Sequence, residues 1–139
     1  MKRETMIQAQ TDQLDALLAM INEDLEAAGC PMEHMVSVAI CAEEIFVNVA
    51  HYGYPNGEGK VRVIEEIEDQ TITLELQDWG TPYNPLEKED PDITLSAKDR
   101  QVGGLGIYMV RNMMDGVSYE YRDEKNCLKM WKSWRQADQ

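Results

Sequence analysis

Basic residues are scarce in this 139-residue sequence. It has 13 Lys and Arg against 26 Asp and Glu, which gives a net charge of −13. Because contact with a phosphate backbone requires a basic surface, this balance argues against nucleic acid and anionic membranes as partners. A self-repelling surface explains the charge most simply, and the alternative is an acidic protein that docks a basic partner.

Long apolar runs and paired cysteines are also missing. No stretch approaches the length that spans a bilayer, and the N-terminal MKRETMIQAQTDQ lacks the apolar segment of a secretory signal. Cys30, Cys41 and Cys127 show no CxxC spacing, so we expect reduced thiols and a cytoplasmic location. With two His residues in the chain, a structural zinc site is not expected.

Hydrophobic residues make up 43% of the chain, enough for one domain spanning residues 1–139. The patterning predicts strands at 2–10, 60–68 and 71–77, helices at 12–28, 31–51 and 104–114, and a closing hairpin at 116–122 and 126–134. This order predicts an α+β fold, a two-layer sandwich with three helices on one face of a mostly antiparallel, mixed sheet. The proline-rich, charged segment 81–102 is typical of a functional lid or of a disordered segment.

The predicted helix 31–51 is apolar nearly all round, which is typical of a buried helix. Its polar residues Glu44, Asn48 and His51 follow an i, i+4, i+7 spacing and share one narrow stripe. A buried stripe of this kind must be satisfied by water, an ion or a polar ligand, because an unpaired buried carboxylate is costly. The alternative is a stripe that faces solvent, with His51 acting as a C-terminal helix cap.

Two more polar signatures follow along the chain. Asp78 ends the strand TITLELQ, whose alternation predicts one solvent-exposed face, and Gly80 gives the backbone freedom to turn there. The run Gly103-Gly104-Leu105-Gly106 then leads into a helix, where backbone N–H groups can bind phosphate. Each motif has an ordinary structural explanation when taken alone, as a turn or as a glycine-rich helix entry.

The ordered set of Glu44-xxx-Asn48, Asp78-x-Gly80 and the glycine run resembles the Bergerat-type ATP-binding domain of histidine kinases, gyrases and related ATPases. The resemblance extends over nearly the whole chain. The stretches EEIFVNVAHYGYP and DWGTPYNP are most similar to the small anti-sigma factor serine/threonine kinases of bacteria. This resemblance implies ATP and Mg²⁺ as cofactors.

The resemblance also implies residue roles. Asn48 would hold Mg²⁺, and Glu44 would be the general base. Asp78 would accept a hydrogen bond from the adenine amino group, and Gly80 would leave room for the ring. The remaining nucleotide contacts would come from the backbone of the glycine run and from a cation at the end of the lid: Gly103, Gly104, Leu105, Gly106 and either Arg100 or Lys98.

The implied function is phosphorylation of a small anti-anti-sigma protein of the STAS type by a kinase that also binds a sigma factor. A homodimer is a further expectation. The alternative is a non-catalytic ATP-binding module that regulates through partner binding. The sequence departs from the family pattern twice: His51 follows Asn48 by three residues instead of four, and Val102 replaces a first glycine.

Overall fold

The computed structural model describes residues 1–87 and 104–135. A five-stranded sheet in the order β1-β2-β3-β5-β4 forms one layer, and its four strand pairings are all antiparallel. The strands are β1 (Lys2–Gln8), β2 (Lys60–Glu68), β3 (Thr71–Asp78), β4 (Gly116–Arg122) and β5 (Lys125–Ser133). The predicted α+β fold is confirmed, with no parallel pairing among the described strands.

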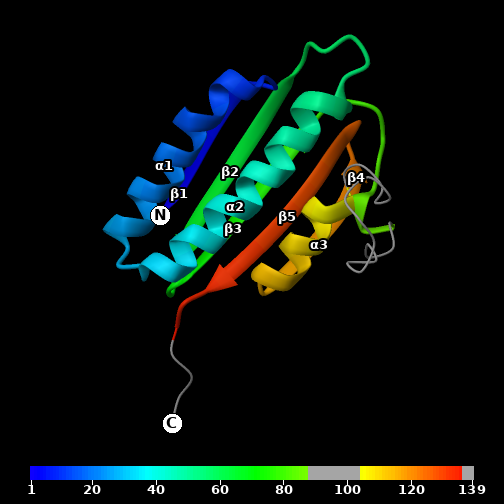
Figure 1. Ribbon diagram of the computed structural model, residues 1–139. Coiled ribbons are helices and arrows are strands. Elements are labelled where there is room, and N and C mark those ends of the chain that lie inside the picture. The colour runs from blue at the N-terminus through cyan, green and yellow to red at the C-terminus, as the bar shows by residue number, and fades with distance from the viewer. Residues whose placement is uncertain (88–103, 136–139) are drawn as a thin grey trace.

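Three helices cover one face of this sheet (Figure 1). They are α1 (Leu14–Ala27), α2 (Met32–Asn48) and α3 (Gly104–Met113), and α2 lies between the other two. Short 3₁₀ turns at Thr11–Gln13 and Pro85–Glu87 flank the regular elements, and α2 continues into a π-helical turn at Val49–Gly53. The predicted elements are therefore present, with ends that differ by a few residues.

Two tight turns connect the hairpins. Asp69 and Gln70 join β2 to β3 with φ values of 52° and 59°, and Asp123 and Glu124 join β4 to β5 with φ values of 53° and 62°. Two successive residues with positive φ are typical of type I′ turns, which match the twist of antiparallel strands. The first of these turns fills the gap between the predicted strands 60–68 and 71–77.

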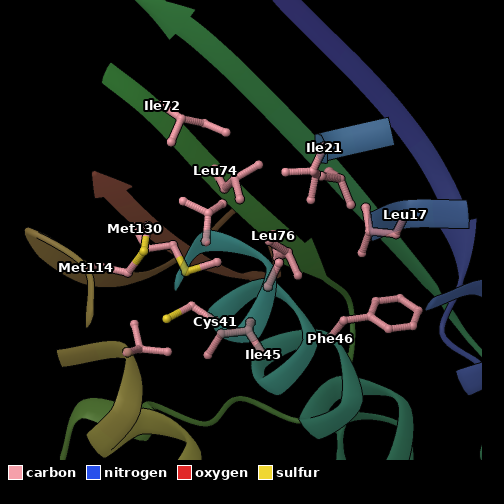
Figure 2. Packing of buried hydrophobic residues seen from close by; sticks show 14 of the residues in the cluster. Leu17, Ile21, Cys41, Ile45, Phe46, Ile72, Leu74, Leu76, Met114 and Met130 are labelled. Atoms are coloured by element: carbon pink, nitrogen blue, oxygen red, sulfur yellow. The ribbon is translucent and has the colours of Figure 1, made fainter. Parts of the chain in front are cut away.

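The core lies between the sheet and the helices. Leu74 and Leu76 point from β3 toward α2, where Ile45 lies, and Met130 of β5 lies beside Met114 (Figure 2). Alternation along β3 and helical spacing along α2 place these side chains in contact, as the sequence patterns predict. Trp134 is also buried against this core.

The prediction that the outer face of β3 is exposed to solvent is wrong at Glu75 and Gln77. Glu75 and Gln77 keep only 8% and 2% of their surface exposed, although the three described helices lie on the other face of the sheet. Arg122 lies over Glu75, with its Nη2 3.2 Å from Oε2, and Lys125 Nζ donates to Gln77 Oε1 at 3.3 Å. Long basic side chains from the neighbouring hairpin therefore replace water on this part of the sheet.

The prediction that α2 is buried nearly all round is wrong. Val36 remains 49% exposed and Met32 71% exposed, because only the sheet side of α2 faces the core. The expectation that no stretch approaches the length that spans a bilayer is also wrong, because by length and composition alone Met32–Gly53 is apolar enough to cross a membrane. Core helices of folded domains share this property. Here the buried side chains of α2 belong to the core beneath it.

Candidate functional site

The polar stripe of α2 meets the start of α3. Glu44 and Asn48 are half-buried, one helical turn apart. A Cβ built on Gly106 would lie 3.0 Å from Glu44 Oε2 and 3.4 Å from Asn48 Nδ2, so a larger residue there would press against both side chains. Two of the three motifs that are separate in the sequence are thus in contact.

Helix α3 begins at Gly104, inside the glycine run. The first N–H groups of a helix have no carbonyl partner within it, and they carry the positive end of the helix dipole. Because Gly106 lies against Asn48, these donors are next to the end of the polar stripe. Lys98, Arg100, Val102 and Gly103 lie outside the described residues, and so do the side-chain surroundings of Leu105.

A cavity of about 470 Å³ opens beside this contact. Its walls come from α2 and its π-helical end, from β3, β4 and β5, and from residues 81–85. The lining residues are Ile45, Asn48, Val49, Tyr52, Gly53, Leu76, Asp78, Thr81, Pro82, Tyr83, Pro85, Tyr119, Asn126 and Leu128. A largely apolar hollow of this size with a few polar groups is typical of small-molecule sites. Asn48 and Asp78 share it, whereas Glu44 lies outside its lining, toward Gly106.

Asp78 occupies the buried end of this cavity, with 6% of its surface exposed. Burial raises the pKa of its carboxyl group, while hydrogen bonds from Asn126 and Gly80 counteract the rise. Both bonds end on the same atom: Oδ1 accepts from the Gly80 N–H at 3.0 Å and from Asn126 Nδ2 at 3.0 Å. Within the described chain Oδ2 receives no hydrogen bond, so one acceptor remains for a ligand.

Asn126 is a site residue that the sequence patterns did not reveal. Its Nδ2 donates to Asp78 Oδ1 and to the Thr81 carbonyl, both at 3.0 Å. Its Oδ1 accepts from the Tyr83 N–H at 3.0 Å and from the Tyr119 hydroxyl. This buried amide holds the carboxylate and the chain after β3 in one arrangement. The β3–β5 register, which pairs Asp78 with Asn126, is the signal that would have found it.

Gly80 lies where β3 leaves the sheet. A Cβ at this position would be 2.0 Å from the Gly53 carbonyl oxygen, which also accepts the Thr81 N–H at 3.0 Å. The close approach of two backbone segments therefore requires glycine here, before any ligand is considered. Its predicted role in admitting a flat ring stays a prediction.

The π-helical turn explains the fate of His51. Because a π-helix has more residues per turn than an α-helix, the stripe calculated for α-helical spacing does not continue beyond Asn48. His51 is exposed and contacts the ring of Tyr52 edge-on, with centroids 5.9 Å apart. Tyr52, four residues after Asn48, lines the cavity instead. The prediction that His51 shares the stripe with Glu44 and Asn48 is therefore wrong, and His51 does not line the cavity.

The first part of the predicted lid is tied to the domain. The Tyr83 N–H is held by Asn126, and Arg111 Nη2 of α3 donates to the Leu86 carbonyl at 2.5 Å. Leu86 packs against the hydrophobic core. The segment 81–87 therefore forms a fixed wall of the cavity, and the remaining lid residues lie outside the described chain.

The family model of the histidine kinase-like ATPase domain matches residues 7–132 of this chain. The chain belongs to the histidine kinase-like ATPase family. The match includes all three motifs, and it agrees with the geometry: the motifs converge on one cavity and on one helix N-terminus.

Curated relatives of this family member are serine/threonine-protein kinase BtrW of Bordetella bronchiseptica and anti-sigma F factors. BtrW is 27% identical over 93 residues, which is 66% of each chain. The anti-sigma F factor of Clostridium acetobutylicum is 28% identical over 89 residues, 64% of this chain and 62% of its own. That of Bacillus subtilis is 26% identical over 94 residues, 67% of this chain and 64% of its own. The matched region thus spans under two thirds of each relative.

A solved structure has the same fold. The crystal structure of the RsbU and RsbW domains of a Mycobacterium tuberculosis protein superposes with a TM-score of 0.69 at 12% identity. The superposition covers 96% of this chain and 32% of that chain. At this identity the likeness concerns the arrangement of helices and strands alone.

The described residues of the site are too few to hold a metal ion by themselves, but they suit an ion that is also bound by nucleotide phosphates. In residues 1–87 and 104–135, no group of three or more His, Cys, Asp or Glu is placed to hold a metal. Mg²⁺ is commonly bound by one or two protein oxygens together with substrate phosphates and water. The Asn48 side chain makes no hydrogen bond to the described residues and lines the cavity, so its amide oxygen is available for such a role.

Proposed function

We propose that this protein is an ATP-dependent serine/threonine kinase that acts as an anti-sigma regulatory factor. The observation that carries the proposal is that Asn48 and Asp78 line one cavity, while Gly106 lies against Asn48 and Glu44 beside it. Family membership and the names of the relatives support it.

Adenine recognition is assigned to Asp78. Its free Oδ2 is an acceptor for the 6-amino group, while Asn126 and Gly80 hold Oδ1. Guanine has a carbonyl oxygen at that position, which would meet a carboxylate oxygen and leave it unpaired at a buried site. The apolar walls, including Ile45 and Leu128, provide the surface on which the base packs.

Phosphate binding is assigned to Asn48 and to the N-terminus of α3. With Mg²⁺ bound to the phosphates, negative charge on the γ-phosphoryl group is neutralised. Asn48 would hold that ion, and the N–H groups that begin at Gly104 would donate to phosphate oxygens. In a chain with a net charge of −13, such local donors oppose the long-range repulsion of a triphosphate. Arg100 or Lys98, with Gly103 and Leu105, belong to the same proposal.

Phosphoryl transfer is assigned to Glu44. The hydroxyl oxygen of a Ser or Thr on the acceptor protein bonds to the γ-phosphorus, the bond to the β–γ bridging oxygen breaks, and ADP leaves. Glu44 takes the hydroxyl proton. Its place at the Gly106 contact puts a carboxylate beside the donors of α3, at the rim of the cavity. General-base help of this kind contributes about 10²–10⁴-fold to a rate.

The partners follow from the same proposal. The acceptor is a small anti-anti-sigma protein of the STAS type, and the regulated partner is a sigma factor, with exchange between the two. A cytoplasmic location and a homodimer belong to this proposal. The names of the anti-sigma F factor relatives support the sigma-factor part.

A phosphotransfer assay with radiolabelled ATP and a candidate acceptor protein tests the proposal. Wild type should transfer label to Ser or Thr, and Glu44→Gln should bind Mg-ATP normally while transferring at least about 100-fold more slowly. Glu58→Gln is the matched control, because Glu58 is an exposed carboxylate that does not line the cavity. ATP binding without transfer by wild type would instead establish a non-catalytic regulatory module.

A further inference from the structure

A shallow groove of about 310 Å³ runs between α1 and α2, on the side of α2 that is turned away from α3. Leu18 and Asn22 of α1 line it opposite Met32, Val36, Ile40 and Glu43 of α2. The floor is apolar, and both Met32 and Val36 are well exposed, at 71% and 49%. None of these residues belongs to the nucleotide cavity.

The groove is bounded by acidic side chains. Asp15 lies one turn before Leu18 on α1, and Glu26 lies one turn after Asn22. On α2, Glu33 lies one turn before Val36, and Glu43 follows Ile40 by three residues. All four carboxylates are exposed.

The two helices run in opposite directions (Figure 1). Asp15 and Glu43 therefore flank one end of the groove, and Glu26 and Glu33 flank the other.

Neither of the two helices that form this groove carries a Lys or an Arg. Residues 5–59, which include both helices, contain several Asp and Glu but no Lys or Arg. Of the four flanking carboxylates only Glu33 has an ion-pair partner in the described residues, the imidazole of His34 at 3.5 Å. Unneutralised acids around an apolar floor favour a partner that brings both apolar and basic groups.

We propose that the α1–α2 groove is a docking site for an amphipathic α-helix of a partner protein, with an apolar stripe in its middle and Lys or Arg at both ends. Asp15 and Glu26 are 11 residues apart on α1, about 16 Å at 1.5 Å per residue. A helix of about 12 residues has the same length. An amphipathic helix in an apolar groove is a common recognition mode, and Met32 offers an adaptable contact.

Other occupants fit less well. A nucleic acid or an anionic membrane would meet four carboxylates. A second copy of this chain, paired groove to groove about a two-fold axis, would bring acidic ends against acidic ends. The docking proposal does not depend on kinase activity, because the groove and the nucleotide cavity share no residue.

The test uses a fluorescent, lactam-bridged helical peptide of 12 residues with three Leu at helical spacing and two Lys at each end. Fluorescence anisotropy should show saturable binding that weakens as salt rises. Val36→Asp should weaken it at least about tenfold, since it places a charge on the apolar floor. Met6→Asp is the matched control, because Met6 is also 49% exposed but lies on β1, outside the groove.

Glu43→Lys is the second variant, and it should weaken binding in the same direction by reversing one flanking charge. Amide chemical shifts of the ¹⁵N-labelled protein should change in α1 and α2, with or without Mg-ATP. A peptide with Glu in place of Lys should not bind. The proposal is overturned if the basic peptide shows no saturable binding up to about 1 mM, if Met6→Asp weakens binding as much as Val36→Asp, or if the shifts gather at the nucleotide cavity.

Discussion

Asn126 Nδ2 lies 3.0 Å from Asp78 Oδ1, so an amide on β5 fixes the carboxylate that ends β3. The same side chain holds the Thr81 carbonyl and the Tyr83 N–H. One buried residue thus orients the proposed adenine acceptor and supports the wall of the cavity beside it. This arrangement gives the first prediction.

Asn126→Ala should weaken ATP binding about tenfold or more. It leaves the Thr81 carbonyl and the Tyr83 N–H without their partner, at a cost of about 1–3 kcal/mol for a buried polar group, and it frees the Asp78 carboxylate to rotate. Isothermal titration calorimetry with Mg-ATP measures the effect. Tyr121→Ala is the control, because Tyr121 is paired with Asn126 in the sheet register but is 45% exposed. Equal affinities for the two variants would contradict the assignment.

Gly106→Ala should separate stability from activity. Alanine is favoured over glycine inside a helix by about 1 kcal/mol, so α3 itself should not be weakened. The new methyl group would lie 3.0 Å from Glu44 Oε2, which must move. We expect an unchanged or higher melting temperature together with phosphotransfer slowed about tenfold. A variant that transfers phosphate at the wild-type rate would show that the Glu44 position is not critical.

Gly80→Ala should destabilise the fold. Its Cβ would be 2.0 Å from the Gly53 carbonyl oxygen, a backbone atom that cannot move without shifting the end of α2. Overpacking of this kind costs about 1–3 kcal/mol in the free energy of unfolding. Urea denaturation measures it. Gly57→Ala is a useful comparison, because Gly57 has φ of +74° but open space around it, so that backbone strain alone is tested.

Glu65 should make stability depend on pH. It is fully buried on β2, near Asp24 of α1 and with its Oε2 3.9 Å from Arg3 Nε. Burial, and then the neighbouring Asp24 carboxylate, raise the pKa of Glu65 to about 8. Between the unfolded value near 4.5 and the folded value of about 8 the folded state binds the extra proton, so stability should fall as pH rises through this window.

Asp24 affects the pH dependence of stability at lower pH than Glu65 does. The neighbouring Glu65, and then the hydrogen bonds from Arg3, lower the pKa of Asp24 below the ordinary 3.8, so its contribution is lost only in more acidic solution. Urea denaturation at pH 5 to 8 should therefore report mainly Glu65. Glu65→Gln should flatten the pH profile, and Glu66→Gln, at an exposed neighbouring position, should leave it unchanged. A profile that Glu65→Gln does not alter would assign the effect to another group.

Local patterns predicted the elements well. The alternation of Ile72, Leu74 and Leu76 placed β3, and helical spacing placed Glu44 and Asn48 on one face of α2. These properties depend on neighbours in the sequence, so they can be read without knowing the fold. The glycine run likewise marked the start of α3, because a close approach between helices requires residues without side chains.

Features that depend on pairing between distant segments were not predictable. Asn126 reaches Asp78 only because β5 lies between β3 and β4, an order that the chain sequence does not state. Glu65 faces the core because side chains alternate between the two faces of β2. The cost of burying its carboxyl group is reduced by Asp24 and Arg3, which come from other elements. The burial of Glu75 depends in the same way on Arg122 of a different hairpin.

The π-helical turn Val49–Gly53 accommodates one residue more than an α-helical turn would. It sets the length of chain between α2, on one side of the cavity, and the Gly53 carbonyl that binds the Thr81 N–H on the other. Deleting one residue there would convert the turn to α-helical geometry and rotate everything beyond it by about 100° relative to α2. The Gly53 carbonyl would then swing away from Thr81, and Tyr52 would leave the pocket. This segment should therefore tolerate changes of side chain far better than insertions or deletions, and any homologue with a different length here must rebuild the opposite wall as well.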